Sequence, residues 1–267
     1  MATIQQATLV PGESHPLPSA LGTVLRQHKQ TVQNFARSVP ETERVAFACC
    51  FTTAAIGTYW EALQKDQTAV LPLRQPPTST PNVDLDRTFR AQATIIGKAA
   101  ALLDPIEAGF QLGEIYTGAL PDALRGRYGI YYTPPTLTRR LLALATAAGV
   151  DWTTCRVLDP ACGGGAFLTP VALTMVDALA GCEPPTILEN LERRLRGIEV
   201  DPFSAWMTQV LLEAALLELC RAAGRWLPRF VTVADSLEQE PVGEGFDLVI
   251  GNPPYGRVTL SQELRAR

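Results

Sequence analysis

The sequence predicts an α/β protein in which an all-helical N-terminal region precedes an incomplete parallel sheet. Three observations support this fold class. Apolar residues recur at helical spacing over roughly the first 120 residues. After Gly126, short apolar or β-branched runs alternate with helical patterns, and a glycine-rich turn follows the first of these runs. Strands that alternate with helices of this length form βαβ units, whose strands run parallel with helices on both faces of the sheet.

The N-terminal part divides into a leader and a helical region. Residues 1–18 contain three prolines and no periodic pattern, so we expect a flexible leader. Helical spacing then runs from residue 19 to about 65 with a break at Pro40, and returns at 86–103 and 105–120. Residues 71–84 contain four prolines and read as a linker. We therefore expect a helical region over 19–125 and a second domain over 126–267.

The second part contains four expected strands. They lie at residues 156–159, 194–200, 229–235 and 246–254, with helical patterns at 165–180 and 203–222 between them. The carboxyl ends of parallel strands meet at one edge of a sheet, and ligands bind at that edge in open α/β folds. The residues that end these strands are therefore the candidate site residues.

Composition limits the function classes. The 267 residues are 46% hydrophobic and 19% charged, enough to bury a core, and the net charge of −4 argues against a surface that binds nucleic acid throughout. The six cysteines have no paired spacing and the two histidines are His15 and His28, so we expect no metal site. The N-terminus does not resemble a signal peptide and no apolar run approaches membrane-spanning length, so we expect a cytoplasmic protein without membrane association.

The glycine turn follows the first strand in the sequence DPACGGGAFL, residues 159–168. A phosphate-binding loop needs a lysine after its last glycine, and a dinucleotide turn needs a third glycine where this chain has Leu168. A nucleoside ligand without a pyrophosphate remains, and Asp159 before the glycines suits a ligand that carries an amine. The alternative is a turn that only lets a helix and a strand pack closely.

Two further strand ends carry acidic residues. Glu199 ends the second strand in GIEVDP, where ribose hydroxyls can donate to it and Val200 can flank a base, although a solvated turn acid is the simpler alternative. Asp235 follows the third strand and could accept a hydrogen bond from an adenine amino group. It could equally cap a helix.

The fourth strand ends in Asn-Pro-Pro-Tyr, residues 252–255. Two prolines cannot continue a strand, so the chain leaves the sheet as a rigid loop. If an adenine amino group donates to the Asn252 side chain and to the Pro253 carbonyl, its nitrogen can become tetrahedral and expose a lone pair. Tyr255 would stack on a base extruded from the duplex. A plain turn is the alternative.

These motifs, together with Tyr-Tyr-Thr-Pro at residues 131–134, resemble the N6-adenine-specific DNA methyltransferases of type II restriction-modification systems. The resemblance covers residues 126–257 and implies a Rossmann-like fold that binds S-adenosyl-L-methionine. It implies that the cofactor is held by Tyr132, Thr133, Asp159, Ala161, Gly163, Glu199, Val200, Asp235 and Ser236. Within this set, Thr133 is implied at the methionine carboxylate end of the cofactor. It implies that the target adenine, flipped out of double-stranded DNA, is held by Asn252, Pro253, Pro254 and Tyr255.

Other interpretations remain open at this point. Similar enzymes with the Asn-Pro-Pro-Tyr motif methylate RNA or protein glutamine, and an inactive methylase could serve as a binding subunit. The chain ends twelve residues after Tyr255. The resembling domains continue with further strands and a target-recognition region. We therefore expect a truncated methylase, or one half of an enzyme that a second chain completes.

Overall fold

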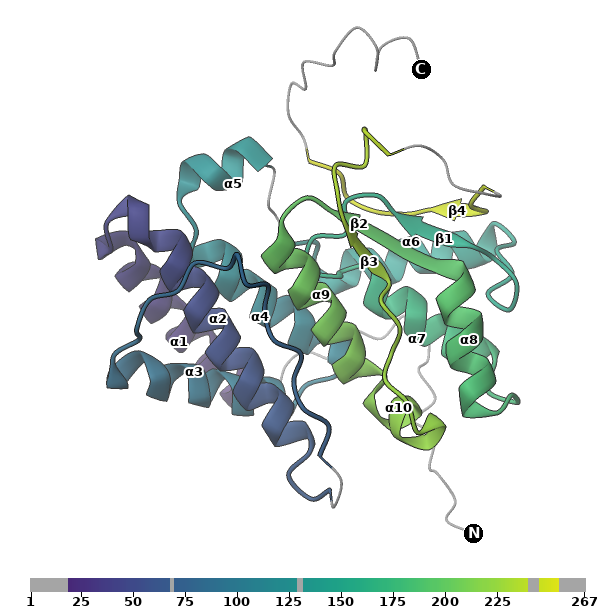
Figure 1. The fold of residues 1–267 in the computed structure, drawn as a ribbon, viewed down its shortest axis with the longest axis horizontal. Helices are drawn as coiled ribbons and strands as arrows, with labels where there is room; N and C mark the ends of the chain where they lie inside the picture. Colours follow the sequence, from purple (N-terminus) through teal and green to yellow (C-terminus); the bar gives the residue numbers. More distant parts are fainter. Residues whose placement is uncertain (1–18, 68–69, 129–131, 240–244, 255–267) are drawn as a thin grey trace, which may run out of the picture.

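The computed structural model describes residues 19–67, 70–128, 132–239 and 245–254. Its first half is helical, as the sequence predicts (Figure 1). The helices of this half are α1 (Ser19–Ser38), α2 (Glu41–Leu63), α3 (Arg87–Ala100), α4 (Pro105–Ala119) and α5 (Asp122–Tyr128). The proline-rich residues 70–86 form no helix or strand.

The helix boundaries follow from local chemistry. Asp86 accepts a hydrogen bond from the Phe89 N–H at 2.9 Å and begins α3. Asp104 accepts from the N–H groups of Ile106 and Glu107, both at 3.1 Å, and Pro105 occupies the first turn of α4. These caps explain why the predicted starts agree with the observed ones.

The second half contains a four-stranded parallel sheet. Its strands are β1 (Val157–Asp159), β2 (Leu195–Glu199), β3 (Val231–Val233) and β4 (Leu248–Val249), in the order β3-β2-β1-β4. The helices of this half are α6 (Pro135–Ala147), α7 (Leu168–Ala178), α8 (Pro184–Arg194), α9 (Pro202–Ala215) and α10 (Leu217–Ala223). All four strands occur where the sequence predicts them. The parallel order brings Asp159, Glu199 and the residues after β4 to one edge.

The structure adds to the sequence expectations in two ways. Helices α6 and α8 were not expected. Pro135 begins α6, and Pro184 and Pro185 lie in the first turn of α8, a position that suits proline. The expected helix over 203–222 divides at Leu216 into α9 and α10.

The two faces of the sheet are covered to different extents. Val157 and Leu195 are buried on the face that packs against α7, whereas Leu158 and Ile198 on the opposite face are only partly buried. We expected helices on both faces, and the described helices bury one face more completely than the other.

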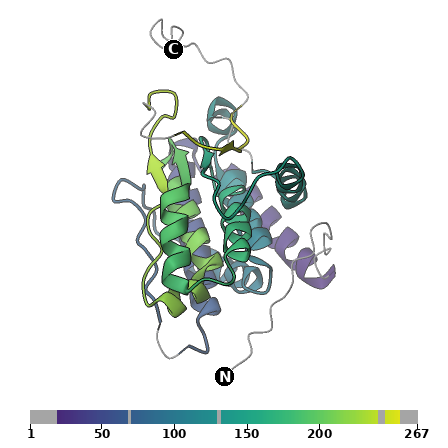
Figure 2. The same cartoon turned by 90° about the vertical axis from the view of Figure 1, so that its right-hand side faces the viewer.

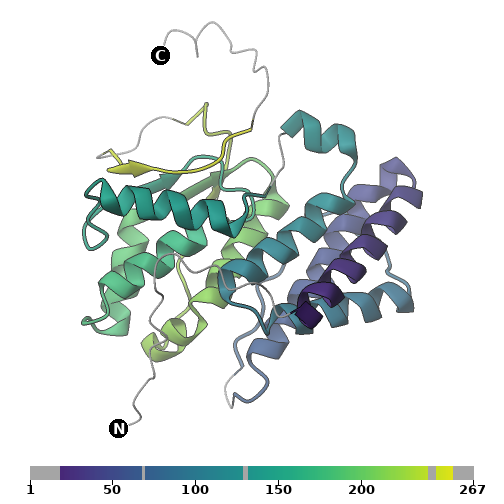
Figure 3. The ribbon, with the colours of Figure 1, turned by 180° about the vertical axis from the view of Figure 1, so that it is seen from behind.

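The hydrophobic core consists of two clusters that meet at α9. Phe203, Met207 and Val210 of α9 belong to the cluster of the helical region, while Leu212 belongs to the cluster under the sheet. Figure 1 shows α9 between the two halves, and Figure 2, viewed from the side of the sheet, shows the purple and blue helices of the first half farther from the viewer than α8. From behind, α6 lies beside β4 (Figure 3). Helix α9 is therefore buried from both sides.

A segment of the linker binds the two halves together. Arg74 forms an ion pair with Glu213 of α9 and donates to the Leu227 carbonyl at 2.8 Å. The Trp206 indole N–H donates to the Arg74 carbonyl at 2.9 Å, and Trp60 stacks on Trp226 with ring centroids 5.9 Å apart. The linker thus contributes specific contacts rather than a simple connection.

Among the described residues, no single helix is long and apolar enough to cross a bilayer. Helices α9 and α10 together reach that length and composition, but they bend by 69° where they meet.

Candidate functional site

The glycine turn is tied directly to the end of β2. The Gly163 N–H donates to the Glu199 carboxylate at 2.8 Å, and the Cys162 N–H donates to the Ile198 carbonyl at 3.0 Å. Gly163 and Gly165 have φ values of +52° and +82°, which residues with a side chain rarely adopt. The turn therefore requires glycine for its backbone conformation. The structure brings together the first two motifs predicted from the sequence.

Glu199 uses both carboxylate oxygens to organise the edge of the sheet. Besides accepting from Gly163, it accepts from the Asp201 N–H at 2.9 Å. Burial raises the pKa of Glu199, while the N–H donors of Asp201 and Gly163 act in the opposite direction. Each oxygen has a second lone pair, so the carboxylate can still accept from ligand hydroxyls. Val200, which follows it, is 53% exposed and so is accessible to a base.

Asp159 is the most unusual ionisable group at this edge. Its side chain is 1% exposed, and among the described residues its Oδ2 atom has no hydrogen-bond partner. Its Oδ1 atom accepts from the Ala161 N–H at 3.2 Å. Burial, with the nearby charge of Glu199, raises the pKa of Asp159 to about 7. An unpaired buried carboxylate of this kind would be stabilised by a cationic ligand.

Thr133 and Asn252 meet across 119 residues of sequence. The Asn252 side-chain N–H donates to the Thr133 hydroxyl at 3.2 Å, and Thr133 is 5% exposed. This contact commits the amide nitrogen as a donor, so the amide oxygen remains available as an acceptor. Pro253 and Pro254 are exposed. Tyr131 and Tyr255, which belong to the same two predicted motifs, lie outside the described residues.

Tyr132 is packed between two glycines. A Cβ atom on Gly113 of α4, or on Gly164 in the glycine turn, would overlap its ring. Its hydroxyl contacts the Met207 sulfur at 3.8 Å. The ring is thus enclosed by α4, the glycine turn and α9, and the structure gives Tyr132 a packing role beside the predicted cofactor role.

Asp235 and Ser236 lie at the end of β3. The Asp235 side chain is exposed, and it accepts from the Leu237 N–H at 3.0 Å to form a turn. The helix start that we considered is therefore a turn instead. Its predicted contact with an adenine amino group stays a prediction.

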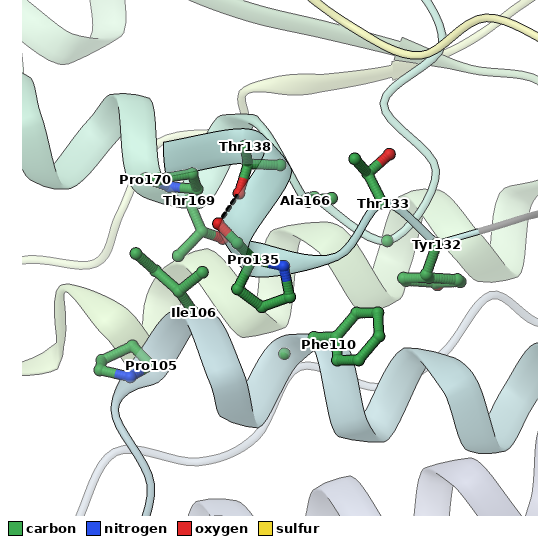
Figure 4. Close-up of a pocket in the computed structure, with 13 residues that line it drawn as sticks. Pro105, Ile106, Phe110, Tyr132, Thr133, Pro135, Thr138, Ala166, Thr169 and Pro170 are labelled. Carbon is green, nitrogen blue, oxygen red and sulfur yellow. Dashed lines mark hydrogen bonds between the residues drawn. The ribbon is translucent and has the colours of Figure 1, made fainter. Parts of the chain in front are cut away.

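A pocket lies between α4, the start of α6 and the glycine turn (Figure 4). Figure 4 shows Ile106 and Phe110 of α4 facing Thr133 and Ala166 across it. The sequence did not indicate that α4 forms one wall. A signal was available, because Gly109 and Gly113 lie four residues apart on one face of that helix and allow close approach. The pocket is lined by Pro105, Ile106, Gly109, Phe110, Tyr132, Thr133, Pro135, Thr138, Gly164, Gly165, Ala166, Thr169 and Pro170.

Comparison with known proteins identifies the family. The sequence model of the family N-6 DNA Methylase matches residues 110–265, more than half of the chain. The chain belongs to this family. Its match includes residues 110–119 of α4 and every motif of the site. The observed parallel sheet with a helical region before it agrees with an incomplete Rossmann-like methyltransferase fold. Members of this family need a methyl donor.

Several curated type II methyltransferases are similar to this chain. M.TthHB8I of Thermus thermophilus is 32% identical over 149 residues, which are 54% of this chain and 25% of that protein. M.BstVI of Geobacillus stearothermophilus is 29% identical over 145 residues, which are 51% of this chain and 26% of that protein. M.PaeR7I of Pseudomonas aeruginosa is 33% identical over 112 residues, 39% and 19% of the two chains. The chain spans about a quarter of the length of the first two relatives.

Among solved structures, a cryoEM structure of a DrdV-DNA complex aligns with 82% of this chain and 24% of that chain. The sequence identity is 18% and the TM-score is 0.42. So low a TM-score supports no inference about this chain.

Proposed function

We propose that this N-6 DNA Methylase chain holds the cofactor and the target base of a site-specific DNA adenine-N6 methyltransferase of a restriction-modification system. The observation that carries the proposal is the hydrogen bond between Thr133 and Asn252. It joins the segment expected at the methionine end of S-adenosyl-L-methionine to the segment expected at the adenine amino group. Donor and acceptor must lie side by side for methyl transfer.

The residues at the sheet edge fit S-adenosyl-L-methionine as the donor. When bound, it supplies an electrophilic methyl group on a positively charged sulfur. The buried Asp159 carboxylate, whose Oδ2 atom is unpartnered among the described residues, suits the ammonium group of its methionine part. Ala161 and Gly163 would lie along the same part, with Tyr132 and Thr133 beside them. Glu199 would bind the ribose.

The adenine end of the cofactor would contact residues of β2 and β3. Val200 is exposed beside Glu199 and can pack on a purine ring. Asp235 and Ser236 follow β3, next to β2, and can accept from the purine amino group. These assignments rest on position in the sheet.

The Asn-Pro-Pro segment would act on the target adenine. The Asn252 amide oxygen and the Pro253 carbonyl can each accept one N–H of the adenine amino group. The two acceptors withdraw the nitrogen lone pair from conjugation with the ring, and they are preorganised because prolines restrict the loop and Thr133 holds Asn252. Pro254 rigidifies the segment. Tyr255 would stack on the base after it leaves the duplex.

Calorimetry of S-adenosyl-L-methionine binding tests the cofactor half of the proposal. Glu199→Gln should weaken binding by more than about tenfold, because one charged acceptor is lost. Glu192→Gln is the matched control, since Glu192 lies on α8 with its side chain 48% exposed and should bind like the parent. A parent chain that binds no S-adenosyl-L-methionine would overturn the proposal.

Label transfer tests the acceptor. Tritiated S-adenosyl-L-methionine is incubated with unmethylated duplex DNA, with RNA and with protein, and modified nucleosides are identified by mass spectrometry. Label recovered as N6-methyladenine in DNA, lost in Asn252→Ala and kept in Asn190→Ala, is the expected result. Label in RNA or glutamine would favour the other acceptors. Cofactor binding without transfer to any of the three would favour an inactive binding subunit, or an enzyme that a second chain completes.

Two further points belong to the same proposal. Double-stranded DNA would be the macromolecular partner, with a second chain as a candidate source of target recognition. A cytoplasmic location would follow from action on DNA.

A further inference from the structure

Helix α4, which belongs to none of the sequence motifs, contacts the cofactor-binding edge at two places. The first is the Tyr132 ring, which is packed between Gly113 of α4 and Gly164 of the glycine turn. Because a methyl group on either glycine would overlap the ring, the ring thickness sets the separation between α4 and the turn. Figure 4 shows Tyr132 beside α4, close to Phe110.

The second contact lies one turn further along α4. The Tyr116 hydroxyl donates to Asp201 Oδ2 at 2.9 Å, and Tyr116 is 3% exposed. Asp201 begins α9 by accepting from the N–H groups of Phe203 and Ser204 at 3.1 and 3.2 Å. Burial, followed by the charge of Asp201, raises the pKa of Tyr116, so the hydroxyl remains a donor at physiological pH.

Asp201 is in turn hydrogen-bonded to Glu199. The Asp201 N–H donates to Glu199 Oε1 at 2.9 Å, and Glu199 Oε2 accepts from Gly163 at 2.8 Å. A continuous hydrogen-bonded path thus runs from Tyr116 through Asp201 and Glu199 to the glycine turn. It meets the Gly113–Tyr132–Gly164 packing at the same turn, so α4 contacts the turn by two routes.

We propose that Gly113 and Tyr116 of α4 are positioning residues for the cofactor-binding edge. Gly113 sets how closely the glycine turn approaches α4, because the Tyr132 ring lies between them. Tyr116 sets the orientation of the Glu199 carboxylate through its hydrogen bond to Asp201. The inference rests on the proposed cofactor site and deepens it, because it makes the helical region part of that site. The affinity for S-adenosyl-L-methionine should therefore depend on residues that do not touch the ligand.

A pair of glycine substitutions tests the first route. Gly113→Ala should weaken S-adenosyl-L-methionine binding by more than about tenfold, because its methyl group displaces the Tyr132 ring toward the turn. Gly57→Ala is the matched control: Gly57 is also within a helix, but a Cβ there would lie more than 4 Å from every atom of the described residues beyond its own stretch of helix. Both variants gain helix propensity, so only displacement of the ring distinguishes them.

A double-mutant cycle distinguishes displacement of the Tyr132 ring from a general loss of stability. In a Tyr132→Ala background the added methyl group has no ring to displace, so Gly113→Ala should cost less than about twofold in affinity. Gly57→Ala should have the same small effect in both backgrounds. Additive losses for Gly113→Ala in the two backgrounds would overturn the first route.

Tyr116→Phe tests the second route and preserves shape if Gly113→Ala fails to fold. Loss of one hydrogen bond to a carboxylate should weaken S-adenosyl-L-methionine binding by about tenfold. Tyr59→Phe, a second buried tyrosine carried by α2, is the control and should bind like the parent. A parent that binds no S-adenosyl-L-methionine defeats the proposed function itself. A parent that binds, with Gly113→Ala and Tyr116→Phe binding equally tightly, defeats only this inference.

Discussion

The helical region and the sheet edge bury different kinds of side chain, with different consequences for stability. The helical core is almost wholly apolar: Phe47, Phe51 and Phe89 pack with ring centroids 5.3 to 6.4 Å apart. The sheet edge buries the carboxylate of Asp159, with one oxygen that has no partner among the described residues. The first arrangement stabilises the fold, whereas the second destabilises it until a cation binds. Substitutions in the helical core should therefore lower the stability and leave the ligand affinity nearly unchanged, whereas substitutions at the sheet edge should lower the ligand affinity.

The largest effect should come from the helical core. Phe51 is fully buried, and Phe51→Ala should lower the free energy of unfolding by about 4 kcal/mol because it leaves a cavity. The affinity of the folded fraction for S-adenosyl-L-methionine should change less than about twofold, since Phe51 lies outside the site. Urea unfolding and calorimetry measure the two quantities. Val70→Ala, at a position 62% exposed, should shift stability by less than about 0.5 kcal/mol.

The second-largest effect should appear in the pH dependence of the free energy of unfolding. Burial raises the pKa of Asp159 from 3.8 to about 7, so the folded state keeps a proton that the unfolded state releases. Stability should therefore fall as pH rises between these values, by about 1.4 kcal/mol per pH unit from this group. Asp159→Asn should remove that part of the slope and also weaken S-adenosyl-L-methionine binding by more than about tenfold.

The slope is measured by urea unfolding at pH 5, 6 and 7. Glu189→Gln, an exposed position on α8, should keep the slope of the parent. If Asp159→Asn kept it as well, Asp159 would not be the buried titrating group that distinguishes the sheet edge from the helical core.

A smaller effect should come from the contact between the two regions. Arg74 is 30% exposed and pairs with Glu213, which is 1% exposed. Arg74→Ala should cost about 2 kcal/mol of stability, because it leaves a buried carboxylate without its cation. Arg90→Ala removes the exposed Arg90–Asp84 pair and should cost less than about 0.5 kcal/mol. Equal losses in the two variants would mean that the linker does not bind the halves together.

The smallest effect should come from the proposed base contact. Val200 and Val233 are 53% and 52% exposed, at the ends of neighbouring strands. Val200→Ala should weaken S-adenosyl-L-methionine binding about threefold through lost apolar contact, while Val233→Ala leaves it unchanged. Neither substitution should alter stability by more than about 0.5 kcal/mol. Equal binding by both variants would remove Val200 from the proposed site.

Short-range signals account for what the sequence predicted well. The caps at Asp86 and Asp104 and the positive φ of Gly163 depend on neighbours a few residues away. The same signals failed where one pattern has two meanings. Helices α6 and α8 were missed, although Pro135 and Pro184 begin them, because proline suits a first turn as well as a loop. The expected leader over residues 1–18 and the boundary near residue 125 stay predictions.

The sequence alone determined the positions of the four strands along the chain, the strand ends that carry acidic residues and the family motifs, because each depends on residues close together in the chain. The tertiary structure decided which of these residues touch. Thr133 meets Asn252, and Gly113 contacts Tyr132 opposite Gly164. It also decided that Asp159 is buried with a raised pKa, since that property depends on surroundings supplied by Gly251 and Glu199. Burial and charge at a site are set by distant segments, so local sequence patterns cannot specify them.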